Sequence, residues 1–327
     1  VTPSQDMVLG NYYLTMEETK TEFLAKSKKL AANKDFEEAE RYELYANSEG
    51  KVFRHVNEVL LAYQTKQIHL HNRIAILGRA IHKTGLTKEM EEGYLITSVG
   101  KIIFNQIFPN DFPFLNAVNP DNLADNIPGY FVPKGTNIKE YVNKQPLMPP
   151  FKKKDLGKII NEIFQRYDRK GNPKTSAVLD KLKDQGFRYS TVAGFSISLT
   201  DVPVVSGKKE ILSDGDHKVE EINEMFAYGL LTDAERHNQV VKVWTNVLDT
   251  VRTRLTTEWK LNNKNPIYMM SDSGARGNIS NITQLAGMRG LMGNTSGGTI
   301  ELPVKSCFRE GMNVSEFFIA THGARKG

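Results

Sequence analysis

Residues 267–293, which read IYMMSDSGARGNISNITQLAGMRGLMG, join two runs rich in glycine, serine and arginine to a short apolar repeat. The repeat has helical spacing and consists of Ile279, Ile282, Leu285, Met288 and Met292. Apolar residues three to four positions apart predict one buried face of a helix, and a small polar residue before them predicts its N-cap. We therefore expect a helix that begins after Asn278 or Ser280.

The segment before this helix, residues 272–277, is a glycine-rich loop that carries Arg276. A loop of this kind at a helix N-terminus offers free backbone N–H groups and the positive end of the helix dipole. A guanidinium beside them can donate two parallel hydrogen bonds to phosphate oxygens. Two interpretations remain open from the residues alone: an anion-binding cradle, or a tight turn before an ordinary helix.

The length of 327 residues allows one large domain or two to three smaller ones. With 39% hydrophobic and 25% charged residues, the composition is ordinary for a soluble globular protein. The formal net charge of +5 favours an anionic partner, although solvated lysines alone can produce it. The sequence has no run of 18 apolar residues and no signal pattern, so we expect neither a membrane span nor export.

Cysteine and histidine usage argues against a metal site. Cys307 is the single cysteine, which excludes an internal disulfide framework and a cysteine-based zinc site and fits a reducing compartment. His69 and His71 lack acidic or cysteine companions at ligand spacing, so strand or surface positions explain them better. Asp214 and Asp216 are expected to cap a following helix.

Four strings are long enough to carry a family resemblance: PSQDMVLGNYYLT at 3–15, YMMSDSGARG at 268–277, QLAGMRGLM at 284–292 and FREGMNVSEFFIATHGARKG at 308–327. They resemble the beta-prime subunit of bacterial RNA polymerase, and the resemblance covers nearly the whole chain. The chain starts without methionine and stops soon after an apolar helical pattern begins at Val314. The resemblance therefore implies a fragment of a longer subunit, from just after the catalytic magnesium loop to the first turns of the bridge helix.

The expected fold is mostly α with irregular α+β parts, in four segments of a polymerase subunit. Residues 1–115 would form a helical segment near the pore and active site, with a helical insertion of two short helices near 17–47. Residues 116–205 would form a linker followed by a funnel-type helical segment. Residues 206–258 would form a protruding antiparallel αα-hairpin at the rim of the secondary channel. Residues 259–327 would hold the nucleotide-proximal loop and helix, a flexible loop and the start of the bridge helix.

Shorter patterns predict local structure inside these segments. Residues 99–107 read as a buried helix, and 156–184 as two helices around a turn. Residues 186–197 alternate aromatic and small side chains, which favours a buried irregular segment. Residues 294–298 are typical of a hairpin turn, and 299–304 alternate as a strand does.

The clearest local pattern is the αα-hairpin. Its first helix has an apolar face made of Val219, Ile222, Met225 and Phe226. Thr232 and Glu235 match a capping box at the start of the return helix. In the family that the chain resembles, regulators dock on such rim helices. The resemblance thus implies a regulator-docking surface, with a plain solvated helix as the alternative, at Glu235, Arg236, His237, Asn238 and Gln239.

The resemblance also implies how the chain would meet nucleotides. Arg276 would contact the triphosphate of the incoming NTP, and Gln5 would lie near the route by which nucleotides enter. At the start of the bridge helix, His322, Arg325 and Lys326 would face nucleic acid or the catalytic centre. No catalytic residue is expected in the chain. The Mg²⁺ ligands of the assembled enzyme would lie outside it, and no zinc is expected.

The expected partners follow from the same resemblance. They are the beta, alpha, omega and sigma subunits, the DNA template and RNA, NTP substrates and secondary-channel transcription factors, in the cytoplasm and not at a membrane. The isolated chain is expected to be inactive. Two other classes of function remain open: a stand-alone phosphate-binding or nucleotide-binding enzyme that uses the loop at 272–277, and a regulator-docking scaffold centred on the hairpin.

Overall fold

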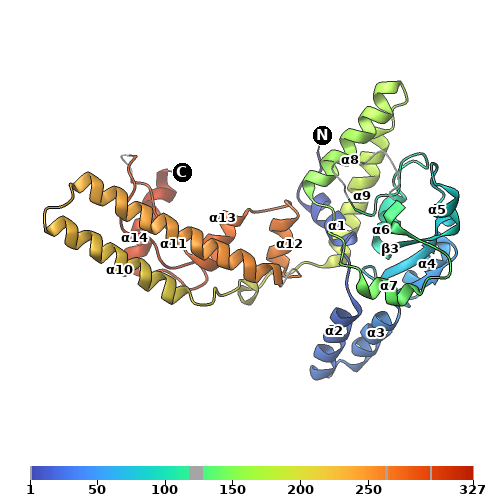
Figure 1. Ribbon diagram of the computed structural model, residues 1–327, viewed down its shortest axis with the longest axis horizontal. Helices are drawn as coiled ribbons and strands as arrows, with labels where there is room; N and C mark the ends of the chain where they lie inside the picture. The colour runs from blue at the N-terminus through green and yellow to red at the C-terminus, as the bar shows by residue number, and fades with distance from the viewer. Residues whose placement is uncertain (1, 118–127, 262–263, 295–296, 327) are drawn as a thin grey trace. The chain divides into compact units, whose positions relative to one another are not determined.

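The computed structural model shows a chain built mostly of helices with one small sheet (Figure 1). This confirms the expected fold class. Across the described residues, no helix is long and apolar enough to span a bilayer. The structure describes residues 2–117, 128–261, 264–294 and 297–326, and their side chains except those of 261 and 322–326.

The chain divides into two units, and each unit has its own hydrophobic core. The first unit comprises Val1–Phe195 and Ser273–Ala275. The second unit comprises Ser196–Asp272 and Arg276–Gly327.

A mixed sheet with strand order β1-β2-β3-β4 lies in the first unit. β1 and β2 run parallel, so their connection crosses over through the helix α4 (Val56–Gln64). β2 pairs with β3, and β3 with β4, in antiparallel register. The two central strands are short runs of mainly apolar residues that are buried on both faces. The strands are β1 (Lys51–Phe53), β2 (Arg73–Leu77), β3 (Tyr94–Ser98) and β4 (Phe131–Val132).

The helices that complete this unit pack at close range. A methyl group added to Gly10 of α1 would lie 1.8 Å from the carbonyl oxygen of Gly186 in α9, so only glycine permits this crossing. A methyl group added to Gly100 of α6 would likewise lie 1.7 Å from the carbonyl oxygen of Leu14 in α1. The elements are α1 (Asp6–Leu14), η1 (Gly78–Ile81), α5 (Lys88–Glu92), α6 (Val99–Asn105), η2 (Pro128–Tyr130), α7 (Ile138–Lys144), α8 (Lys153–Arg166), η3 (Asp168–Lys170) and α9 (Thr175–Ala193).

The pair α2 (Lys20–Ala32) and α3 (Phe36–Asn47) forms a helical hairpin that extends from the sheet-bearing part of this unit, as Figure 1 shows. It confirms the two short helices predicted near 17–47. Thr19 and Glu22 form a capping box at its start. Phe23 is buried between the two helices with Tyr45 as a neighbour, which gives the hairpin a small core of its own.

The second unit is built on the predicted αα-hairpin, which the structure confirms. α10 (Lys208–Ala227) and α11 (Asp233–Leu261) lie side by side (Figure 1). The capping box of Thr232 and Glu235 opens α11: the Thr232 backbone N–H donates to Glu235 over 2.9 Å, and the Glu235 N–H donates to the Thr232 hydroxyl over 3.3 Å. The remaining elements are η4 (Leu199–Asp201), α12 (Pro266–Asp272), α13 (Ile279–Ile282), the π-helical turn η5 (Thr283–Gly287) and α14 (Val314–Lys326).

Two predictions about helix limits were wrong. Asp214 and Asp216 do not cap a helix, because α10 begins six residues before Asp214, directly after Gly207 at φ 65°. Asp216 instead forms an ion pair with Lys305 over 2.6 Å. Residues 186–193 are not irregular either, although 195–197 are. α9 continues through Ala193, since its face around Gly186 is the face that crosses α1, and the helix ends at Gly194 in the left-handed region.

The C-terminal third also differs from its predicted elements. The helix expected over 279–292 stops at Gly287, where a Cβ would lie 2.9 Å from a methyl carbon of Val251 on α11. Residues 299–304 form no strand, because they make only isolated bridges, such as Gly290 with Val304. Pro303 also removes a ladder donor there. The predicted turn at 294–298 falls partly outside the described residues, but the Asn294 N–H does donate to the Gly298 carbonyl over 2.7 Å.

Candidate functional site

The loop that carries Arg276 is held in a defined shape by its backbone. Gly274 and Gly277 both have φ 75°, a left-handed conformation that glycine adopts without strain. Between them, the Arg276 N–H donates to the Met270 carbonyl over 3.1 Å, which folds the loop back onto the end of α12. The glycine pattern in the sequence therefore marks two turns that fix where the arginine leaves the backbone.

Buried contacts inside the first unit anchor the loop just before the arginine. The Ser273 side chain is fully buried. The Ser273 backbone carbonyl accepts a hydrogen bond of 2.9 Å from the Lys153 N–H at the start of α8. Ala275 packs against the core of that unit, and its N–H donates to the Ser273 hydroxyl over 3.2 Å. Ser273 and Ala275, on either side of Gly274, are thus part of a packed structure.

Arg276 itself is exposed. None of the carboxylates that the structure describes forms an ion pair with its guanidinium. A planar cation of this kind has five N–H donors in a fork that matches a phosphate or carboxylate. The geometry therefore offers one arginine, fixed at its backbone and open at its side chain, as a candidate anion contact.

The helix after the loop contributes less to anion binding than the sequence suggested. α13 is a single turn of four residues that runs into the π-helical turn. Asn278, one of the two predicted N-caps, is the N-cap: its side chain accepts from the Asn281 N–H over 2.9 Å. One of the free backbone donors is therefore already used, and a helix this short has little dipole to add. The anion-binding capacity of this loop rests mainly on Arg276.

The other residues predicted to meet nucleotides lie in separate elements. Gln5 is exposed at the N-cap position of α1, with φ 50°, and its side chain makes no capping hydrogen bond. It belongs to the first unit, whereas Arg276 belongs to the second. The residues predicted for the bridge helix are in the last turns of α14, and their side chains lie outside the described part of the structure: His322, Arg325 and Lys326.

The residues predicted for regulator docking divide into three groups. Glu235 is engaged in the capping box, and the hydrogen bonds from Thr232 lower the pKa of its carboxyl group. Asn238 and Gln239 are exposed on the first turns of α11. Arg236 and His237 are both engaged within the second unit.

A single carboxylate holds Arg236 and His237. Glu301 accepts two hydrogen bonds from the Arg236 guanidinium, over 2.8 and 2.9 Å, and one of 2.8 Å from His237 Nδ1. These hydrogen bonds lower the pKa of the Glu301 carboxyl group. The Arg236 guanidinium also lies over the ring of Phe226, 5.3 Å from its centroid. We refer to Arg236, His237 and Glu301 as the hairpin clasp, since they join α11 to the loop before α14.

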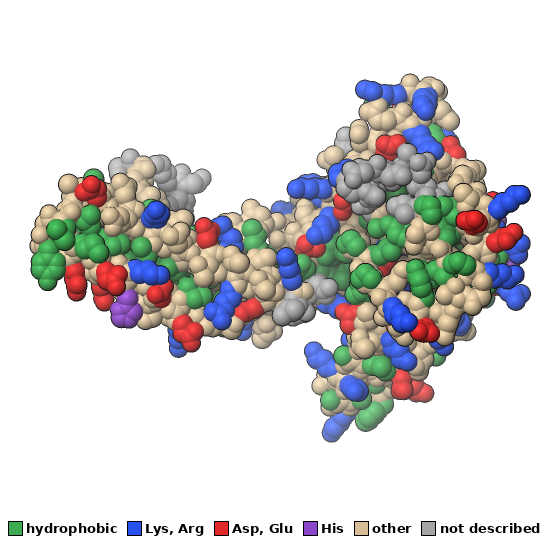
Figure 2. All heavy atoms as spheres, viewed as in Figure 1, with side chains coloured by type: hydrophobic (Ala, Val, Ile, Leu, Met, Phe, Trp, Pro, Cys, Tyr) green, Lys and Arg blue, Asp and Glu red, His purple; other side chains and the backbone are tan. Residues whose placement is uncertain are grey.

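The sequence did not reveal that the free end of the hairpin is apolar. Tyr228 is 81% exposed and Leu230 is 73% exposed, with partly exposed Met225 and Phe226 beside them. Figure 2 shows apolar side chains gathered at the end of the hairpin away from its base. The only available signal was the placement of Tyr228 and Leu230 on either side of Gly229, in a turn where large apolar residues have no core to enter.

Metal chemistry finds no support among the residues that the structure describes. They contain no cluster of three His, Cys, Asp or Glu side chains placed to hold a metal ion. His71 is buried, with Nδ1 3.2 Å from Glu18 and Nε2 2.8 Å from the Tyr13 carbonyl. Mg²⁺ takes oxygen ligands, and the described residues bring no group of three carboxylates together that could supply them.

Comparison with known families gives two matches that cover most of the chain. The model described as RNA polymerase Rpb1, domain 3, matches residues 1–202, and that of RNA polymerase Rpb1, domain 4, matches residues 231–309. The chain is 48% identical to "DNA-directed RNA polymerase subunit beta'" of Shouchella clausii (strain KSM-K16) and of Geobacillus kaustophilus (strain HTA426), and 47% identical to that of Bacillus anthracis. Each alignment covers 100% of this chain and 25% of the relative.

The helical scaffold of the first unit, the arginine loop and α11, the second helix of the long hairpin, lie on residues that these models match, which sets the class as RNA polymerase subunits. The chain belongs to the RNA polymerase Rpb1 family, since the domain 3 model alone matches more than half of it. The resemblance to the bacterial beta-prime subunit is thereby confirmed. The chain spans about a quarter of the length of these relatives.

Proposed function

We propose that this chain acts as part of DNA-directed RNA polymerase, where Arg276 contacts the triphosphate of the incoming NTP. The observation that carries the proposal is the fixed loop that presents an exposed guanidinium, within a chain 48% identical over its full length to beta-prime subunits. In template-directed RNA synthesis, the RNA 3′-hydroxyl attacks the NTP α-phosphorus and pyrophosphate leaves. A positioned guanidinium binds the triphosphate oxygens and offsets charge that develops on the leaving group.

The other parts of the assembled enzyme supply what this chain does not hold. The proposal places the Mg²⁺ ions on ligands outside the chain, where they would activate the attacking hydroxyl and bind the leaving phosphates. It assigns the remaining polymerase subunits, the DNA template, RNA and NTPs as partners. Gln5 and the α14 residues His322, Arg325 and Lys326 are proposed to lie near the substrate or nucleic acid in that assembly.

The test is the Arg276→Ala substitution in the assembled polymerase. Loss of a charge-assisted fork to phosphate costs about 1.5–3 kcal/mol, so the apparent KM for NTP should rise roughly tenfold to a hundredfold in steady-state elongation kinetics. Arg276→Lys should fall between the wild type and Ala, because it keeps the charge but loses the fork. Arg169→Ala, at an exposed arginine on η3, is the control and should leave the KM unchanged. An unaltered KM in Arg276→Ala would refute the assignment.

A turnover measurement on the purified chain alone separates this proposal from that of a stand-alone enzyme. If the purified chain alone bound and turned over nucleotides, the loop would be an independent active site. We expect no turnover, since the described residues bring no group of three His, Cys, Asp or Glu side chains together that could hold a catalytic metal ion beside this arginine.

A second role is favoured by the free end of the αα-hairpin. We propose that it docks regulators of the secondary channel, through the exposed apolar side chains of Tyr228 and Leu230 together with Asn238 and Gln239. Exposed aromatic and aliphatic residues at one point of a monomer surface are typical anchors for a partner. Arg236 and His237 can join that contact only if the regulator displaces Glu301 from the hairpin clasp.

A further inference from the structure

Residues 71–73, which lead into β2, hold the base of the α2–α3 hairpin. His71 contacts the carboxylate of Glu18, which lies just before α2. Arg73 Nε donates to the carboxylate of Glu49, which lies just after α3, over 2.8 Å. Both ends of the hairpin are therefore fastened to one short segment, and the proposed function uses neither contact.

The His71 ring has a hydrogen-bond acceptor at each of its nitrogens. The His71 side chain is 2% exposed and that of Glu18 is 3% exposed. Nε2 lies 2.8 Å from the carbonyl oxygen of Tyr13, and Nδ1 lies 3.2 Å from a carboxylate oxygen of Glu18. Both oxygens of Glu18 also accept from Lys26 Nζ, each over 2.8 Å. An ammonium group on both oxygens favours the ionised carboxylate, which can only accept.

This arrangement fits the protonated imidazolium and not the neutral ring. Only the imidazolium donates from both nitrogens. A neutral ring that kept its proton on Nε2 would turn the lone pair of Nδ1 toward the Glu18 carboxylate, in a place where burial leaves little water to separate them. Tyr13 is the next-to-last residue of α1, and a cation beside the last carbonyls of a helix is favoured as well.

The other titratable groups around His71 favour a neutral state or are already paired. Burial and the Glu18 carboxylate raise the pKa of Tyr13 and of Tyr42, and burial raises the pKa of Tyr45, so all three phenols stay neutral near pH 7. The His71 backbone N–H donates to His69 Nδ1 over 3.2 Å, which keeps that nitrogen unprotonated. The groups that face His71, His69 or Glu18 are Tyr13 of α1, Lys26 of α2, and Tyr42 and Tyr45 of α3.

We propose that the protonation state of His71 controls how firmly the α2–α3 hairpin is attached to the first unit. With both ring nitrogens protonated, His71 holds Glu18 and with it the segment before α2. Loss of the Nδ1 proton removes that hydrogen bond and loosens the start of α2. The other end of the hairpin stays attached, because the guanidinium of Arg73 keeps its charge.

The direction of the pH dependence follows from the charged form being the one that fits. The attachment is complete below about pH 6.5, where an ordinary histidine is charged, and weakens as the pH rises above that value. The hairpin is therefore held more firmly in mildly acidic solution than in mildly alkaline solution.

The experiment is amide hydrogen exchange of the 327-residue chain at about pH 6 and about pH 8, expressed as protection relative to an unstructured peptide at each pH. Protection of residues 20–26, at the start of α2, should fall by about tenfold between the two conditions. Protection of α9 should stay the same. Equal protection of the α2 segment at both pH values in the wild type would overturn the proposal.

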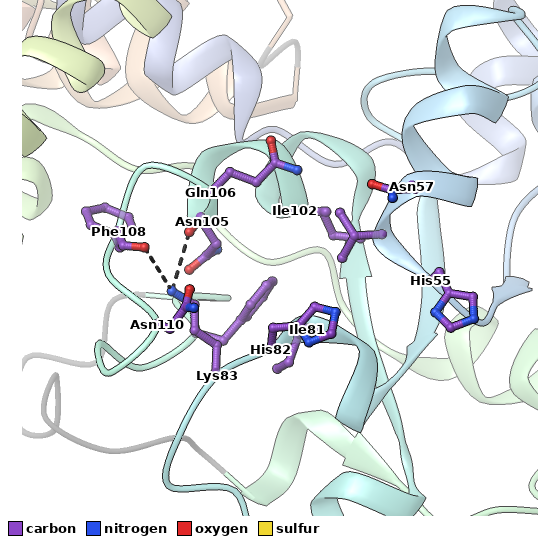
Figure 3. Close-up of a pocket in the computed structure, with 12 residues that line it drawn as sticks. His55, Asn57, Ile81, His82, Lys83, Ile102, Asn105, Gln106, Phe108 and Asn110 are labelled. Atoms are coloured by element: carbon purple, nitrogen blue, oxygen red, sulfur yellow. Dashed lines mark hydrogen bonds between the residues drawn. The ribbon is translucent and has the colours of Figure 1, made fainter.

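Three variants assign the effect to one ring. His71→Gln has no titrating group at this position and should give the same α2 protection at both pH values. His69→Gln should keep the wild-type pH dependence. His55→Gln should keep it too, because the exposed His55 lines an open pocket of about 400 Å³ in the same unit (Figure 3). A pH dependence that survives in His71→Gln, or that disappears in His69→Gln, would contradict the assignment.

Nitrogen NMR of the wild-type chain labelled at histidine reads the proton positions directly and does not depend on any variant. As the pH rises, the resonance of His71 Nδ1 should change to that of an unprotonated nitrogen, while Nε2 keeps its proton on the Tyr13 carbonyl. A neutral ring protonated at Nδ1, or a ring that is neutral at about pH 6, would also overturn the proposal.

Discussion

At the scale of single residues, the core of the first unit contains a lysine with no exposed surface, and a buried charge is costly unless it is paired. The Lys101 side chain on α6 is fully buried, and its Nζ donates to Glu17 over 2.6 Å. The second oxygen of Glu17 accepts from the Met148 N–H over 3.0 Å. Burial lowers the pKa of Lys101, and the Glu17 carboxylate opposes that shift. Each charge is therefore stable in the core mainly because the other is present.

This pairing predicts the effect of removing one partner. Lys101→Met should lower the free energy of unfolding by about 3–5 kcal/mol, because Glu17 would remain buried without its counter-ion. The double variant Glu17→Gln with Lys101→Met should recover most of that loss, since no isolated charge remains. Urea unfolding followed by far-UV circular dichroism measures both.

An exposed pair of the same residue types supplies the control. Lys144 and Glu140 form an ion pair of 2.7 Å on the surface of α7, one helical turn apart. Lys144→Met should cost no more than about 0.5 kcal/mol. A loss in Lys101→Met as small as that in Lys144→Met would show that the buried pair contributes no more than a surface pair.

At the scale of elements, helices with local signals could be predicted and those set by distant contacts could not. The αα-hairpin was predictable because its apolar faces, its turn and its capping box all lie within 40 residues of one another. The extension of α9 through Ala193 depends on a crossing with α1 near Gly10, which no local pattern records. The same applies to Asp216, whose partner Lys305 lies 89 residues away.

The candidate site shows the same division. The loop around Arg276 was predictable because glycine positions and an N-cap are local features. The hairpin clasp was not, because Glu301 lies more than 60 residues beyond Arg236 in a segment that reads as a strand. The role of His71 was also missed, since its two acceptors, on Glu18 and Tyr13, lie 53 and 58 positions earlier in the chain.

The hairpin end gives a prediction at this scale. Tyr228→Ser combined with Leu230→Ser should weaken binding of a secondary-channel transcription factor to the assembled polymerase by about tenfold or more, because interface aromatics and their neighbours carry most of the binding energy. Fluorescence anisotropy with a labelled factor measures the affinity. Both side chains are exposed, so the fold should be unaffected.

Two comparisons make this result specific. Val192→Ser removes a side chain that is also more than half exposed, but on α9, and should leave the affinity for the factor unchanged. The NTP dependence of the double variant should match the wild type, since Arg276 is untouched. Wild-type affinity in the Tyr228 and Leu230 variant would argue that the hairpin end is not the docking surface.

At the scale of the whole molecule, the two units have separate cores. The core of the first unit is centred on the sheet and on α1, α6, α8 and α9, and no buried residue of it belongs to the second core. Both tryptophans, Trp244 and Trp259, are buried in the core of the second unit. Tryptophan fluorescence therefore reports on the second unit alone, whereas circular dichroism reports on both.

This placement predicts that the unfolding midpoints seen by circular dichroism and by tryptophan fluorescence respond differently to substitutions in the two units. Lys101→Met, in the first unit, should shift the unfolding midpoint seen by circular dichroism to lower urea and leave the midpoint seen by tryptophan fluorescence where it is in the wild type. Trp244→Phe, in the second unit, should shift the fluorescence midpoint to lower urea, with Trp259 as the remaining reporter, and should shift only the part of the circular dichroism change that the second unit contributes. Equal shifts of both signals in either variant would mean that the chain unfolds as one cooperative structure.

The crossing of α1 and α9 has a consequence for the order of events during synthesis. The surface that Gly10 contacts, at Gly186, is made 176 residues after Gly10 itself. At about 5–20 residues per second, the apolar face of α1 waits roughly 9–35 seconds for its partner. During that interval Val8, Leu9 and Tyr12 are open to chaperones and to other nascent chains. α1 therefore packs against α9 only after a long stretch of later chain has been made, and until then its apolar face needs other protection from aggregation.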